Sequence, residues 1–219
     1  SGLSGNGGDC WAAGRLGSVA SSMGRPLQNG QADPLVQFNR DFGRLLQQLT
    51  ALPQLLVAAV QGAVMGGGVG LVCVADLVLA DSAAVFATPE VTLGIVPAQI
   101  APFVQRRLGD ARARQWLLCG QRWSARQAFE AGLVQRVVDA SDAASWQAQL
   151  QQQIGQYALA APQAVAASKK LMAGDADQSL DAVLDQAAIA FAQALRGPEA
   201  SAELKAFASK QAVPWACAG

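Results

Sequence analysis

The sequence feature most suggestive of binding or catalysis is a run of three glycines, Gly66-Gly67-Gly68, between two apolar segments. The chain has no histidine. This excludes Ser-His-Asp and Cys-His nucleophile systems, HExxH-type zinc sites and histidine general bases. Acid–base chemistry must therefore use Asp, Glu, Lys, Tyr or Cys side chains, and Tyr157 is the one tyrosine.

The three glycines admit several interpretations. No Lys-Ser/Thr pair follows them, so they do not form a phosphate-binding loop, and GGGVG does not match the GxGxxG pattern of dinucleotide-binding folds. Small residues before a helix let a ligand approach the backbone, and the N–H groups there favour negative charge. The remaining interpretations are tight helix–strand packing and an oxyanion hole in which amides stabilise a thioester enolate.

Composition narrows the class of protein. The 219 residues carry 16 basic and 16 acidic side chains, so no excess charge draws the chain to nucleic acid or to an anionic membrane. Four scattered cysteines without a CxxC pair predict neither a metal site nor a disulfide framework, and they favour a cytoplasmic protein. No apolar run is long enough to span a membrane, and the start of the chain does not have the pattern of a signal peptide.

The elements that would position the glycines alternate between strand and helix patterns. Helical spacing follows Pro34 as far as Leu49, buried strands are expected at 55–60 and 77–81, and 84–93 is expected to be extended around Pro89. Ser124 and Gly132 are expected to cap a helix over 125–131, before a strand over 133–139. Further helices are expected at 97–109, 111–119, 143–160, 162–173, 179–195 and 199–209. This order predicts an α/β domain over residues 1–140 and a helical region over 141–219.

Two long stretches then carry a recognisable pattern. One reads LLVAAVQGAVMGGGVGLVCVADLVLADSAAVFATPEVTLGIVPAQIAPFVQRRLG and the other reads GQRWSARQAFEAGLVQRVVD. Through them the segment from Leu52 to Asp139 resembles the enoyl-CoA hydratase/isomerase (crotonase) superfamily. The earlier stretch LSGNGGDCWAAGRL resembles the family loop L-T-G-x-G-x-x-F-x-A-G-x-D-L. Its small residue falls on Ala12 or Ala13, and Ala13 is preferred because Gly14 follows it.

The resemblance implies a crotonase-like β-β-α spiral core and a C-terminal helical trimerisation region. Members usually begin several dozen residues earlier, so the N-terminal part of the spiral is expected to be missing. The implied substrate is an acyl-CoA thioester, with no metal and no cofactor beyond the CoA of the substrate. The implied partner is a second copy of the chain, in a trimer or hexamer, without nucleic acid or membrane.

The resemblance also assigns the site residues. The N–H groups of Ala13 and Gly67 would hold the thioester oxygen, and Glu90, in TPEV, would move protons at the substrate carbons. An apolar setting should raise the pKa of Glu90, which suits a general acid. The implied substrate-binding positions are Ala12, Gly14, Gly66, Gly70, Pro97 and Gln99.

The reaction itself is left with alternatives. Two-carboxylate hydratases of the family place their first glutamate where this chain has Gly70. A lone carboxylate suffices to move a double bond, which resembles Δ3,Δ2-enoyl-CoA isomerases. Against this, the segment LGIVPAQIAPFV looks most like hydratases acting on branched glutaconyl-type thioesters, so a hydratase leads. A non-catalytic relative that binds CoA thioesters is a further alternative.

Overall fold

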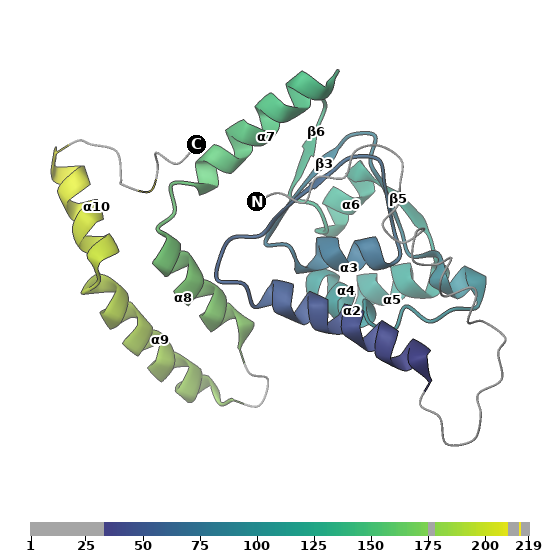
Figure 1. Cartoon of the computed structure of the whole chain (residues 1–219), viewed down its shortest axis with the longest axis horizontal. Helices are drawn as coiled ribbons and strands as arrows, with labels where there is room; N and C mark the ends of the chain where they lie inside the picture. The colour runs from purple at the N-terminus through teal and green to yellow at the C-terminus, as the bar shows by residue number, and fades with distance from the viewer. Residues whose placement is uncertain (1–32, 175–177, 210–214, 216–219) are drawn as a thin grey trace. The chain divides into compact units, whose positions relative to one another are not determined.

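A computed structural model describes residues 33–174, 178–209 and 215 of the chain. These residues divide into two compact units (Figure 1). The first unit contains residues 33–50 and 56–146, and the second contains residues 51–55 and the described residues from Gln147 onward. Each unit is described by itself.

The first unit is built on two small sheets. In one, β1 (Val57–Val60), β3 (Leu77–Asp81) and β6 (Arg136–Val138) are parallel and lie in the order β1-β3-β6. In the other, β2 (Ala63–Met65) is parallel to β4 (Val85–Ala87), and β4 is antiparallel to β5 (Arg122–Ser124). The first four residues of β3 are apolar and buried and Asp81 is half-buried, as expected for a central parallel strand covered on both faces.

Five helices and one 3-10 turn surround these sheets. Helix α3 packs against both α2 and α4, and α4 packs against α5 (Figure 1). The core between them is apolar and includes the fully buried Leu46, Val69, Val78, Val104 and Trp116. The elements are α2 (Pro34–Thr50), α3 (Gly67–Val74), the 3-10 turn η1 (Pro89–Leu93), α4 (Ala101–Leu108), α5 (Asp110–Cys119) and α6 (Ala125–Ala131).

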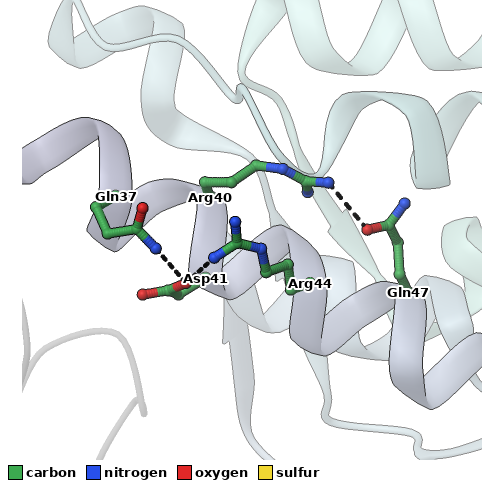
Figure 2. Close-up of polar contacts among 5 residues, drawn as sticks. All are labelled: Gln37, Arg40, Asp41, Arg44 and Gln47. Atoms are coloured by element: carbon green, nitrogen blue, oxygen red, sulfur yellow. Dashed lines mark hydrogen bonds and ion pairs between the residues drawn. The ribbon is translucent and has the colours of Figure 1, made fainter.

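Helix α2 has a polar face and an apolar face. Figure 2 shows the polar side chains: Asp41 accepts hydrogen bonds from Gln37 Nε2 and Arg44 Nη1, each at 2.7 Å, and Arg40 Nη2 donates to Gln47 Oε1 at 3.1 Å. These bonds lie on an exposed surface and join residues of the same helix, so they support the helix only weakly. The opposite face, with Gly43 and Leu46 buried, turns toward α3.

One predicted extended segment is different in the structure. The segment 84–93 was expected to be extended, but β4 ends at Ala87 and η1 begins at Pro89. Proline lacks an N–H group and has a fixed φ that suits the first position of a helical turn, so the chain coils there instead of continuing the strand. Glu90 therefore lies on a short helical turn.

The second unit consists of helices, with α7 (Ala143–Tyr157) leading into it, followed by α8 (Pro162–Ala173), α9 (Leu180–Leu195) and α10 (Pro198–Ser209). Helix α9 contacts both α8 and α10. The carboxylate of Glu199 accepts hydrogen bonds from the N–H groups of Gln163 and Ala164, at 2.8 to 3.1 Å, and so caps the start of α8. Across the described residues, every helix is too short or too polar to cross a lipid bilayer.

Candidate functional site

The glycine run forms a tight turn between β2 and α3. Gly66 precedes the helix with φ 53° and ψ −117°, a conformation that side chains with a Cβ rarely adopt. Its N–H group donates to the carbonyl of Ala87 at the end of β4, at 2.9 Å, and its own carbonyl accepts from Val69 N–H at 2.9 Å. The turn is thus held between the end of one strand and the first turn of the helix.

The first N–H groups of α3 come directly after this turn. A helix leaves its first N–H groups without partners inside the helix. In the part of the chain that the structure describes, the N–H groups of Gly67 and Gly68 have no backbone acceptor outside the helix either. The beginning of α3 therefore offers donors for an oxygen that carries negative charge.

Glu90 lies against the same turn. Its Oε1 atom is 3.0 Å from the point where a Cβ on Gly66 would lie, so the carboxylate covers the glycine backbone. Its Oε2 atom is buried and has no hydrogen-bond partner among the described residues. Burial raises the pKa of Glu90, and a hydrogen bond from its own N–H group lowers the pKa by less. A carboxyl group in this setting holds a proton more readily than one in water.

The segment before Glu90 is fixed by packing. Thr88 is fully buried, and its hydroxyl donates a long hydrogen bond of 3.4 Å to the carbonyl of Trp116 on α5. The Trp116 ring stacks on Trp123 of β5 with a centroid separation of 4.1 Å, and its Nε1 donates to Gln121 O at 2.8 Å. This aromatic layer places the start of η1, and therefore Glu90, relative to the second sheet.

A residue that sequence reasoning missed also reaches the turn. The Phe42 ring of α2 lies 3.3 Å from the point where a Cβ on Gly67 would be. Glu90 and Phe42 therefore contact two successive glycines. Phe42 is one of the apolar residues whose helical spacing predicted this helix, but the spacing gave no signal that the residue meets the glycine turn.

Comparison with known proteins then assigns the chain. The family model described as enoyl-CoA hydratase/isomerase matches residues 21–217. The chain belongs to this family. An enoyl-CoA hydratase/isomerase structure from Marinobacter aquaeolei is 38% identical with a TM-score of 0.83, and the match covers 92% of this chain and 75% of that one. Pseudomonas aeruginosa AtuE is 41% identical with a TM-score of 0.81, covering 94% and 75% of the two chains.

A curated relative gives the same family. Carnitinyl-CoA dehydratase from Proteus mirabilis is 34% identical over 137 residues, which is 62% of this chain and 51% of the relative. The chain thus spans about half the length of this curated relative within the match. The predicted α/β fold of the crotonase type is confirmed by the family match and by the structural neighbours.

In this member of the enoyl-CoA hydratase/isomerase family, the structure brings Gly66, Gly67 and Glu90 together. Gly70 instead lies buried inside α3, where a Cβ would be 2.7 Å from Ile100 Cγ2 and 3.1 Å from Leu46 Cδ1. Its missing side chain therefore makes room for core packing. The space that a carboxylate would need at this position is filled.

The remaining predicted site residues of this family member are Gln99, Pro97, Ala12, Ala13 and Gly14. The side chain of Gln99 lies against Gly43 of α2. Pro97 precedes α4, and its carbonyl accepts from Ala101 N–H at 3.0 Å. Ala12, Ala13 and Gly14 lie outside the described residues.

Proposed function

We propose that this protein is an acyl-CoA thioester enzyme of the enoyl-CoA hydratase type, with Glu90 as its acid–base group. The observation that carries the proposal is the position of the Glu90 carboxylate, which lies against Gly66 with Oε2 buried and unpartnered among the described residues. A partly desolvated carboxyl group, next to helix N–H groups that have no backbone acceptor outside the helix among the described residues, suits proton transfer next to a developing oxyanion. The names of the relatives, including a dehydratase, support hydration as the reaction.

In the proposed mechanism, the thioester oxygen accepts a hydrogen bond from Gly67 N–H, with Ala13 N–H as the second donor. The Glu90 carboxylate takes a proton from water while the water oxygen bonds to the β-carbon. The electron pair of the double bond moves toward the thioester oxygen, and the resulting enolate is held by the two donors. Glu90 then returns the proton to the α-carbon, so one water is added and the carboxylate is regenerated.

One observation favours a second candidate, a Δ3,Δ2-enoyl-CoA isomerase. Because Ile100 and Leu46 fill the space around Gly70, that position has no room for a second carboxylate. A single carboxylate can remove a proton from the α-carbon of a 3-enoyl thioester and deliver it to the γ-carbon. This reaction needs no group to activate water.

The test is to supply purified protein with 2-enoyl-CoA and 3-enoyl-CoA thioesters, alongside a Glu90→Gln variant. A hydratase forms the 3-hydroxyacyl thioester from the 2-enoyl substrate, and an isomerase forms the 2-enoyl thioester from the 3-enoyl substrate. Glu90→Gln keeps the shape of the side chain but cannot exchange the proton, so kcat should fall by about 10²–10⁴-fold. Full turnover by this variant would refute the mechanism. Binding of acyl-CoA without any turnover would identify a non-catalytic relative.

We also propose that the chain forms a homo-oligomer, a trimer or hexamer, through its C-terminal helices. Large apolar side chains on α9 and α10 are exposed within the second unit, including Leu180, Phe191 and Leu204 at 72%, 69% and 66% exposure. Exposed apolar area of this kind is typical of an interaction surface. Light scattering of the purified protein should give the mass of three or six chains, and a monomer mass would refute the proposal.

A further inference from the structure

The aromatic ring of Phe42 lies against Gly67 in the glycine turn, and the mechanism proposed above gives this ring no role. Its Cζ and Cε1 atoms lie 3.3 and 3.5 Å from the point where a Cβ on Gly67 would be. Because Gly67 has no side chain, the ring edge approaches the backbone itself. Adding the bonds of the glycine places the ring edge roughly 6 Å or less from the Gly67 nitrogen.

The position of the ring is fixed by the helix that carries it. Phe42 is half-buried and packs against the apolar core. The next residue, Gly43, is buried, and the side chain of Gln99 occupies the space where a Cβ would lie. Because Gly67 has no side chain, the Phe42 ring of α2 can approach the start of α3, and because Gly43 has none, the side chain of Gln99 can approach α2. Packing against the core therefore favours the position of the ring next to Gly67.

We propose, on the basis of the proposed function, that Phe42 is a specificity-determining residue, the wall that excludes acyl groups branched at the α-carbon. A thioester oxygen that accepts from Gly67 N–H would bring the acyl group to the same residue that the ring edge contacts. Glu90 contacts the adjacent Gly66 and must reach the same α-carbon. In this arrangement the α-carbon would lie between the Glu90 carboxylate and the edge of the Phe42 ring, and a methyl substituent on it would meet the ring.

The test compares two substrates that differ by one methyl group at the α-carbon, 2-butenoyl-CoA and 2-methyl-2-butenoyl-CoA. The wild-type protein should have the higher kcat/KM for the unbranched substrate. Phe42→Ala should lower the ratio of the two kcat/KM values by roughly tenfold or more, the usual effect of one methyl group on pocket discrimination. The matched control is Phe38→Ala, one helical turn earlier and 41% exposed, which should leave the ratio unchanged.

Two further measurements keep the test independent of folding and of the reaction. Phe42→Leu retains apolar packing but has a smaller side chain, so it should also lower the ratio of the two kcat/KM values. It serves as the test variant if Phe42→Ala does not fold. The Kd values of butanoyl-CoA and 2-methylbutanoyl-CoA report selectivity without turnover. The wild-type protein should bind butanoyl-CoA more tightly than 2-methylbutanoyl-CoA, and the Phe42 variants should reduce this difference.

The outcomes separate this inference from the proposed function. If the wild-type protein turns over enoyl-CoA but neither ratio shifts in the Phe42 variants, the specificity role is wrong and the proposed function stands. If nothing is turned over but the Kd ratio shifts in the Phe42 variants alone, the proposed reaction is wrong and the wall is supported. If no acyl-CoA binds to the wild-type protein, both are overturned.

Discussion

Replacing Gly66 with alanine should damage the site more than it damages the fold. At φ 53° and ψ −117°, an alanine is strained, and residues held in such regions cost about 1–3 kcal/mol. For a chain of this length, that cost corresponds to a decrease in Tm of roughly 2–12 °C. The added Cβ would also lie 3.0 Å from Glu90 Oε1, so the carboxylate must move by a few tenths of an ångström.

This displacement sets the expected loss of activity. A misplacement of about 1 Å can cost on the order of 100-fold in rate, so a shift of a few tenths of an ångström should lower kcat/KM by roughly 3–10-fold. The control is Gly62→Ala. Gly62 has a φ of 72°, but nothing lies within 4 Å of its Cβ position, so this variant has backbone strain without contact to Glu90.

The assay is kcat/KM for an enoyl-CoA thioester, measured well below the Tm of each variant, together with thermal denaturation. We expect both variants to lose stability and Gly66→Ala alone to lose catalytic efficiency. Equal kcat/KM values for Gly62→Ala and Gly66→Ala would refute the reasoning, because they would show that the contact between the turn and Glu90 has no effect on the reaction.

The remaining predictions concern Glu90 and Gly70. Burial raises the folded-state pKa of Glu90, so the fold favours its protonated form, and this contribution is lost as the pH rises through the raised pKa. The Tm of Glu90→Gln, relative to the Tm of the wild type, should therefore increase as the pH is raised from acidic to neutral. A Tm difference that does not change with pH would contradict this. Gly70→Glu should cost about 1–3 kcal/mol or more by overpacking against Ile100 and Leu46, without increasing hydration. Urea denaturation measures the loss of stability, and the enoyl-CoA assay measures the hydration rate. A Gly70→Glu variant that is as stable as the wild type and hydrates faster would contradict the prediction.

The sequence predicted those elements that are specified by nearby residues. Ser124 and Gly132 were expected to cap one helix, and the structure confirms both. The Ser124 hydroxyl accepts from Gln127 N–H at 3.2 Å, the Gln127 side chain accepts from Ser124 N–H at 2.9 Å, and Gly132 has a φ of 88°. These bonds form within a single helical turn, so a local pattern is sufficient to find them.

Elements that depend on partners far away in the sequence were predicted less well from local patterns. The strand over residues 63–65 was not predicted, because it has only three residues and pairs with β4, which follows α3 and β3 in the chain. The strand expected over 133–139 is limited to Arg136–Val138, the residues that pair with β3. At the site, the resemblance selected the glycine turn and Glu90. The contact of Phe42 with Gly67 depends on how α2 packs on α3, and it left no trace in local spacing.

The turn that carries Glu90 is closed mainly by the main chain. The carbonyl of Glu90 accepts from Ile95 N–H at 2.8 Å, the carbonyl of Val91 accepts from Gly94 N–H at 3.2 Å, and Gly94 adopts the left-handed conformation that ends the turn. Leu93, within this turn, is 68% exposed in the first unit and is not needed to hold it. Mutations that alter its side chain can therefore accumulate without moving the carboxylate. In a laboratory evolution experiment, this position should tolerate many substitutions while the Glu90 carboxylate stays in place.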